Sequence, residues 1–219
     1  MSYYRSRSVC RMGARVIGLL FLCIAIVSGT FAQKPAHPEI RELQGPQDPR
    51  VGFMILVRVQ GAPAADAATG TTKVLQQVTA KANTDLSRGA AARIVVAQAL
   101  KGLVTLPRTN ALSGAVALDR KGRIAAARSS ATGLSTYTSA FCGSVSLGDA
   151  DSATAACTNV ERKALTVQKG LEIALTERPA IGIVVIDKFG NMALSKPSGN
   201  IYRAYIGSDG KAVVEAASQ

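Results

Sequence analysis

Hydroxyl side chains gather around one predicted hairpin in this sequence, and they are its most concentrated source of possible chemistry. Ser113 stands at the leading edge of the segment LSGAVALDRKGRIAAARSSATG. A run of further hydroxyl residues follows it: Ser129, Ser130, Thr132, Ser135, Thr136, Thr138 and Ser139. A serine or threonine attacks a substrate only when a base or a positive environment activates it. The simpler interpretation is structural: Ser113 bonds to nearby backbone at a strand end, and the run is a loop.

The residue inventory excludes two common kinds of site. His37 is the only histidine, and it lies in a proline-flanked segment, which excludes a histidine-based catalytic triad. There is no Cys-x-x-Cys pair and no cluster of cysteine and histidine, which excludes a zinc site. Cys142 and Cys157 lie outside the N-terminal segment and have two interpretations: a disulfide if the protein is exported, or two buried thiols. We expect neither a metal nor a cofactor.

The first 32 residues have the pattern of a secretory signal sequence. Four arginines precede the apolar run VIGLLFLCIAIV, and small residues follow it, so cleavage after Ala32 fits the pattern. An uncleaved membrane anchor is the alternative, because residues 16–32 reach the short limit for spanning a bilayer. The arginine-rich start also leaves an organellar address open. We expect an exported protein: secreted, periplasmic or in the endomembrane lumen.

The net charge indicates a basic surface without a nucleic-acid site. The whole chain carries +12, and removing residues 1–32 leaves +8, because that segment holds four arginines and no acidic residue. The remaining Lys and Arg residues are scattered, and no aromatic residues alternate with them as they do where a protein stacks on bases. We therefore expect no nucleic-acid partner, and a membrane partner only if the N-terminal segment is retained.

The rest of the chain predicts one domain, residues 51–219, after a proline-rich linker at residues 33–50. Residues 51–60 are a β-rich apolar run and predict a strand, and helical spacing of apolar residues predicts helices at 71–82 and 89–102. A further helix is predicted at 158–177, and a hairpin at 205–214 ends the chain. The order of elements predicts stacked sheets flanked by helices.

An internal repeat is the strongest pattern in the sequence. GAVALDRKGRIA at 114–125 and GIVVIDKFGNMA at 182–193 share a glycine, four apolar residues, Asp-x-x-Gly and an apolar pair. Each predicts a hairpin in which Asp119 or Asp187 caps the turn, and the following glycine takes a positive φ. The four-residue apolar runs predict strands that are covered on both faces. Asp119 and Asp187 are therefore turn formers and not a catalytic pair.

These two segments resemble the catalytic β-subunit of the plant-type L-asparaginase/isoaspartyl peptidase family. The members of that family are N-terminal-nucleophile hydrolases. GAVALDRKGRIAAARSSATG resembles the start of that subunit, and GIVVIDKFGNMALSKPSGNIYRAYI resembles its closing hairpin and its Tyr-Arg-Gly-Tyr ending. The family's His-Gly-Gly-Ala-Gly opening has no counterpart before residue 110. The resemblance implies an α/β fold, an αββα sandwich of mainly antiparallel sheets flanked by helices, and an oligomer.

The same resemblance implies where the family's chemistry would lie in this chain. The family uses a threonine hydroxyl whose own α-amino group is the base, and the precursor cuts itself before that threonine. The alignment puts Leu112 at the threonine position, Ser113 at its neighbour and Ser130 at a supporting threonine. The family's Arg-x-Gly-Asp-Ser-Pro substrate loop has no counterpart, and the segment between the hairpins is shorter.

Two functional classes follow from this pattern. The first is an asparaginase-like protein with weak or lost amidohydrolase activity, for which Ser113 and Ser130 are the candidate catalytic residues. Its substrate would be L-asparagine or a β-aspartyl peptide. The alternative is a non-catalytic structural or binding subunit of a membrane-associated complex. The vacant nucleophile position favours a protein that does not hydrolyse its ligand.

Overall fold

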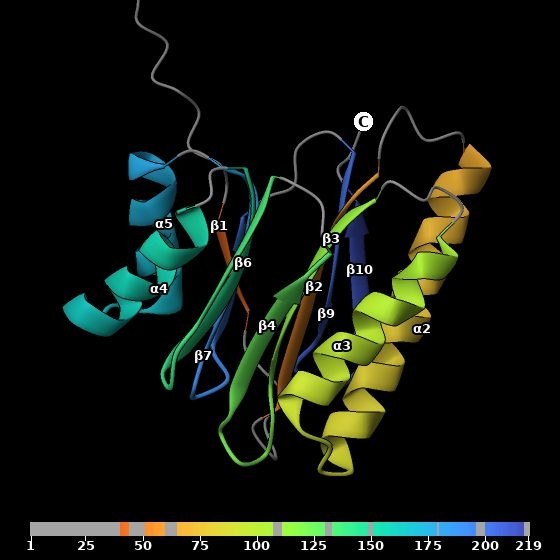
Figure 1. Ribbon diagram of the computed structural model, residues 1–219, viewed down its shortest axis with the longest axis horizontal. Helices are drawn as coiled ribbons and strands as arrows, with labels where there is room; N and C mark the ends of the chain where they lie inside the picture. Colours follow the sequence, from red (N-terminus) through yellow and green to blue (C-terminus); the bar gives the residue numbers. More distant parts are fainter. Residues whose placement is uncertain are drawn as a thin grey trace, which may run out of the picture. The chain divides into compact units, whose positions relative to one another are not determined.

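The computed structural model describes residues 40–43, 51–59, 65–106, 111–129, 133–148, 151–178, 180–195 and 200–216. These residues form an α/β protein with two antiparallel sheets and four α-helices, all within the unit His37–Gln219 (Figure 1). None of the described helices is long and apolar enough to cross a membrane. The expected signal sequence lies outside the described residues, so its removal stays a prediction.

In the described part of the chain, the strands pair into two five-stranded sheets. Sheet A has the order β1-β8-β7-β6-β5: β1 (Ile40–Leu43), β8 (Met192–Ser195), β7 (Ala180–Asp187), β6 (Cys142–Gly148) and β5 (Leu134–Thr138). Sheet B has the order β10-β9-β2-β3-β4: β10 (Ala212–Ala216), β9 (Ile201–Ile206), β2 (Gly52–Arg58), β3 (Leu112–Leu118) and β4 (Ile124–Arg128). The predicted strand at 51–60 and all three predicted hairpins are confirmed.

The helices lie in two pairs, one beside each sheet (Figure 1). The first pair is α2 (Ala65–Ser87) and α3 (Ala92–Gly102), which is followed by the short 3₁₀ helix η1 (Leu103–Thr105). The second pair is α4 (Ser152–Lys163) and α5 (Val167–Glu177). The two helices predicted before residue 103 are confirmed: α2 extends beyond the predicted 71–82 at both ends, and α3 begins three residues after the predicted start at 89 and ends at 102 as predicted.

Three clusters of buried apolar side chains join these elements. One cluster packs β2, β3 and β9 of sheet B against α2 and α3. A second lies between the two sheets and joins β2, β3 and β9 to β6, β7 and β8. The third packs β6, β7 and β8 against α4 and α5. Each sheet is therefore covered by a helix pair on one face and by the other sheet on the opposite face.

Strand β3 contributes to two of these clusters at once. Ala115 and Ala117 lie in the cluster with α2 and α3, whereas Val116 and Leu118 lie in the cluster between the sheets. All four side chains are fully buried. Because successive side chains of a strand point to opposite faces, an unbroken apolar run lets a strand bury apolar side chains on both faces. The prediction from the four-residue runs is thus confirmed.

The two predicted turns are confirmed in detail, because Asp119 and Asp187 make the same hydrogen bonds. Oδ1 of Asp119 accepts from the N–H groups of Lys121 and Arg123, and Oδ1 of Asp187 accepts from those of Phe189 and Asn191. The glycines three positions after the aspartates have φ values of 73° and 85°. Such values favour glycine, which has no Cβ to clash with the backbone.

A third turn of the same geometry joins β9 to β10, although its sequence differs. Gly207 takes the position of the leading aspartate, and its N–H donates to the carbonyl of Lys211 at 2.8 Å. The aspartate has moved to position 209, and its Oδ1 accepts from the N–H of Lys211 at 3.0 Å. Gly210 closes the turn with a φ of 75°. The same turn geometry therefore occurs three times in the described residues, although the Asp-x-x-Gly motif occurs in only two of these turns.

Asp119 also stabilises the start of a helix that is distant in sequence. Helix α3 has no side-chain cap of its own, but its first N–H, that of Ala92, donates to Oδ2 of Asp119 at 3.2 Å. The same carboxylate pairs with the Arg123 guanidinium at 2.8 Å. Burial alone would raise the pKa of Asp119. The hydrogen bonds from Arg123, Ala92 and Lys121 outweigh that effect and hold the pKa below its ordinary value.

Replacing Asp119 with asparagine is expected to lower the free energy of unfolding at pH 7 by about 2 kcal/mol, because the charged acceptor is lost. The pKa of Asp119 is lower in the folded chain than in the unfolded chain. Its charge therefore stabilises the fold above the unfolded pKa of about 4, and this contribution disappears as the pH falls through the folded pKa. Chemical denaturation at neutral and acidic pH measures both effects. Asp209→Asn, in the exposed third turn, is the matched control and should change stability little. Unchanged stability of Asp119→Asn would contradict the cap.

Three sequence-based predictions of local structure are wrong. Residues 158–177 do not form one helix, because Ala164 takes a left-handed conformation and the Thr166 hydroxyl caps a new helix at the N–H of Lys169. The hydroxyl run is not simply a loop, since residues 134–138 form β5. The predicted linker at 33–50 contains β1, which pairs with β8.

Candidate functional site

The predicted nucleophile region lies at the start of β3, where Leu112 and Ser113 face opposite ways. Leu112 packs against the cluster between the sheets, on the same face as Val116 and Leu118. Ser113 has the parity of Ala115 and therefore belongs to the face toward α2 and α3. The Ser113 residue is only 5 % exposed. The Ser113 side chain therefore points away from the space between the sheets, where the Leu112 side chain lies.

The backbone of Ser113 forms a local pair with Ser129. The N–H of Ser113 donates to the Ser129 hydroxyl at 3.1 Å, and the carbonyl of Ser113 accepts from the N–H of Ser129 at 2.7 Å. Among the described residues, no carboxylate or amino group hydrogen-bonds the Ser113 hydroxyl. Ser130 lies outside the described residues, so its supporting role stays a prediction. The local bonding of Ser113 is the arrangement of a structural serine at a strand end.

A concave site that was not predicted lies at one end of sheet A, and we call it the aromatic pocket. It is a hollow of about 480 Å³. Two half-exposed phenyl rings and a lysine form one wall, and the end of α4 with the residues after it forms the other. The lining residues are Phe141, Val160, Glu161, Arg162, Ala164, Leu165, Asp187, Lys188 and Phe189.

The aromatic wall comes from two adjacent turns of sheet A. Phe141 lies in the turn between β5 and β6, and Phe189 lies in the turn between β7 and β8. The N–H of Lys188 donates to the carbonyl of Phe141 at 2.9 Å, which ties the two turns together. The Lys188 ammonium lies 4.0 Å from the centre of the Phe141 ring and 5.0 Å from that of Phe189. Cation–π attraction therefore holds the charge at the aromatic wall.

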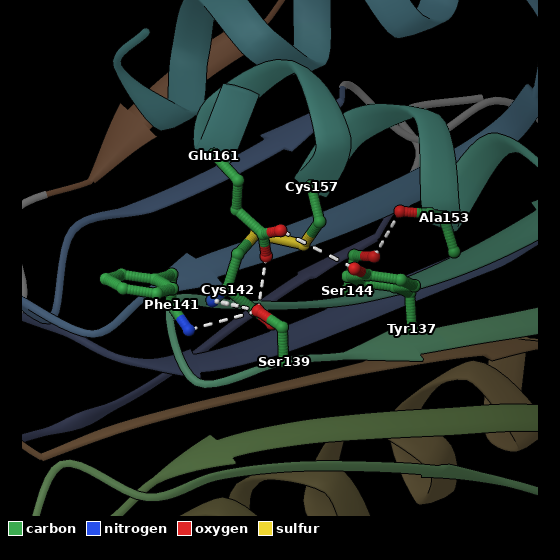
Figure 2. Close-up of a disulfide and its surroundings, with 8 residues drawn as sticks. All are labelled: Tyr137, Ser139, Phe141, Cys142, Ser144, Ala153, Cys157 and Glu161. Carbon is green, nitrogen blue, oxygen red and sulfur yellow. Dashed lines mark hydrogen bonds between the residues drawn. A yellow bond between two sulfur atoms is a disulfide. The ribbon is translucent and has the colours of Figure 1, made fainter. Parts of the chain in front are cut away.

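Figure 2 shows how the two walls of the pocket are connected. A disulfide joins Cys142, next to Phe141, to Cys157 on α4. The Ser139 hydroxyl donates to the Glu161 carboxylate, and it accepts from the N–H groups of Phe141 and Cys142 at 3.0 and 3.1 Å. The Tyr137 hydroxyl reaches the other oxygen of Glu161 at 3.5 Å. One covalent bond and one hydrogen-bond network thus fix the turn to the helix.

The same network argues against catalysis by Ser139, although a serine beside a glutamate resembles a nucleophile beside its base. A hydroxyl oxygen has two lone pairs, and those of Ser139 accept from two backbone N–H groups. No lone pair is then left to attack a substrate. The described residues also contain no group of three or more His, Cys, Asp and Glu side chains placed to hold a metal ion.

Sequence reasoning missed the aromatic pocket because its two phenylalanines are far apart in the chain. Pairing of β6 with β7 places Cys142 opposite Asp187, and this pairing brings the turns at 141 and 188 together. One signal in the sequence could have indicated the pocket. The second Asp-x-x-Gly turn has an apolar residue, Phe189, at the position where the first turn has the polar Lys121. No protein-family model matches this sequence, and no curated protein matches it.

Proposed function

We propose that this protein is an asparaginase-like binding protein that does not hydrolyse its ligand. Its two helix pairs and two stacked sheets form, in this proposal, the αββα sandwich of the N-terminal-nucleophile hydrolases. The observation that carries the proposal is Leu112. It stands at the family's nucleophile position and packs between the sheets, while the neighbouring hydroxyl of Ser113 belongs to the opposite face. A leucine side chain offers neither a nucleophile nor a proton acceptor.

Two further observations support this proposal. The loop that grips the substrate's charged groups in the family has no counterpart in the sequence. The Ser113 hydroxyl lacks a hydrogen bond to any carboxylate or amino group of the described chain, so nothing there activates it. Losing a nucleophile typically costs several orders of magnitude in rate.

Mass analysis of the purified protein under denaturing conditions tests the proposal. We expect one chain with no break between Leu112 and Ser113, and no release of ammonia from L-asparagine or of amino acids from β-aspartyl dipeptides. Ser113→Ala is the matched control, because it removes the hydroxyl and keeps both backbone bonds to Ser129. A fragment that begins with Ser113, or turnover that Ser113→Ala abolishes, would instead show an active serine hydrolase.

The proposal includes export to an oxidising compartment. The N-terminal pattern and the Cys142–Cys157 disulfide both support it, because structural disulfides persist mainly outside the cytosol. N-terminal sequencing of the protein from its natural source should find a chain that begins at or near Gln33. A chain that still begins at Met1 would support the anchored alternative, in which the protein is a subunit of a membrane-associated complex.

A further inference from the structure

The aromatic pocket exposes apolar surface that the fold does not need. Phe141 is 51 % exposed and Phe189 is 55 % exposed, and both lie in turns of sheet A. The equivalent turn between β3 and β4 has Lys121 where the turn of sheet A has Phe189. Exposed aromatic side chains that gather at a hollow commonly mark an interaction site. The Asp-x-x-Gly turn therefore does not require an aromatic residue at position 189, and the two rings together form a surface suited to an interaction.

The acidic side chains of the pocket are hydrogen-bonded within the protein, whereas its basic side chains form no ion pair in the described residues. Its acidic side chains are already used: Glu161 accepts from Ser139 and Tyr137, and Asp187 accepts from its own turn and from the Asn191 side chain at 2.7 Å. Within the described residues, neither Lys188 nor Arg162 forms an ion pair with a carboxylate. An approaching ligand therefore meets two phenyl rings and two available positive charges.

The walls of the pocket are also held in place before any ligand arrives. The disulfide and the Ser139–Glu161 bond both connect the turn that carries Phe141 to α4. Helix α4 is in turn tightly packed on α5, where Gly170 leaves room for Val160: a Cβ at Gly170 would come within 2.6 Å of its Cγ2. A site fixed in this way loses little conformational entropy on binding.

From these contacts we propose that the aromatic pocket binds an acidic peptide segment of a partner protein through one bulky apolar side chain. The apolar side chain packs on the exposed surfaces of the Phe141 and Phe189 rings beside the Lys188 ammonium, and flanking carboxylates pair with Lys188 and Arg162. This inference rests on the proposed role as a binding protein and names the chemistry of its partner. The concave shape fits an inserted side chain better than a flat membrane surface, and the Lys and Arg residues of the sequence are scattered and not gathered as at a nucleic-acid site.

The absence of tryptophan from the whole sequence makes a direct test possible. A peptide of sequence EEWEE, blocked at both ends, can be excited selectively, and burial of its indole shifts the emission to shorter wavelength. We expect a saturable blue shift on titration with the protein. The basic peptide KKWKK should show none, because its charges oppose Lys188 and Arg162. The peptide EEAEE should compete poorly, because it lacks the apolar side chain.

The repeated turn supplies matched variants at equivalent positions. Lys188→Glu and Phe189→Ser alter the pocket, whereas Arg120→Glu and Lys121→Ser make comparable changes in the turn between β3 and β4. We expect each pocket variant to weaken binding of EEWEE about tenfold or more, the size of an interface hot spot. The two control variants should change the affinity by less than about twofold. Thermal unfolding of all four variants verifies that they remain folded.

Several results would overturn this inference. Equal losses for Lys188→Glu and Arg120→Glu would mean general charge attraction, and equal binding of KKWKK would mean unspecific apolar contact. Binding to anionic vesicles or to single-stranded RNA in place of the peptide would assign the pocket to another partner. Self-association that Phe189→Ser abolishes, without peptide binding, would assign it to a second copy of the chain. None of these results restores amide hydrolysis, so failure here remains distinct from failure of the proposed function.

Discussion

Replacing Gly114 with alanine is expected to lower the free energy of unfolding by about 3 kcal/mol, the upper part of the range for an overpacked core. Gly114 lies on β3 where this strand faces β6 of the other sheet. A Cβ at this position would come within 2.3 Å of Cγ1 of Val145 on β6. Val145 is fully buried and β-branched, so its side chain cannot rotate away easily. The sheets must then separate or the strand must shift.

The matched control is the same substitution at Gly70, in helix α2. No heavy atom lies within 4 Å of a Cβ built there. Alanine favours a helix over glycine by about 1 kcal/mol, so Gly70→Ala should raise stability by that amount. Urea denaturation of both variants measures the two effects with opposite signs. Wild-type stability of Gly114→Ala would show that the sheets are not in close contact at this point.

Removing the Cys142–Cys157 disulfide is expected to cost about 3 kcal/mol, the value for a loop of this length in the chain-entropy account. The bond joins positions 15 residues apart in sequence and connects β6 to α4. Both cysteines are fully buried, and the hydrogen bond from Ser139 to Glu161 connects the same turn to α4 without a covalent bond. The double variant Cys142→Ala, Cys157→Ala should unfold at a correspondingly lower denaturant concentration.

Two controls separate the covalent bond from the packing of the sulfur atoms. Either single variant breaks the bond completely, so each should lose almost as much as the double variant. Wild-type protein unfolded in the presence of a reductant should approach the double variant, and without reductant it should not. A free-thiol count of the unfolded, unreduced protein should find neither Cys142 nor Cys157 reactive. Reactive thiols at both positions would establish the alternative of two buried cysteines.

The sequence by itself determined the elements that depend on neighbouring residues. Unbroken apolar runs identified β3 and β7 as buried strands, because a strand that is covered on both faces buries apolar side chains in both directions. The Asp-x-x-Gly pattern identified two turns, because the aspartate bonds to backbone within four residues and glycine alone takes the positive φ readily. Helical spacing identified α2 and α3 for the same local reason. The sequence predicted no residue of the aromatic pocket as a binding residue; the candidate site that it did predict, at Leu112 and Ser113, came through a resemblance and stays a prediction.

Where local patterns were weak, only the tertiary structure decided the outcome. Strand β5 is an edge strand rich in hydroxyl residues, so it lacks the apolar alternation that marks a strand, and its pairing with β6 decides its conformation. The break between α4 and α5 depends on Ala164, a residue that ordinarily favours helix, and packing of Gly170 against Val160 requires the reversal. In both cases a contact between residues distant in sequence outweighs the conformation that the local residues prefer.

The site depended on the same long-range contacts. Leu112 and Ser113 point to opposite faces because they are neighbours in a strand, but only the packing of sheet B decides which face meets the helices and which meets sheet A. Phe141 and Phe189 meet because β6 pairs with β7 in one register, and a shift by one residue would separate them and reverse every side chain. Strand register is set by the buried faces of a whole sheet, and no short stretch of sequence contains that information.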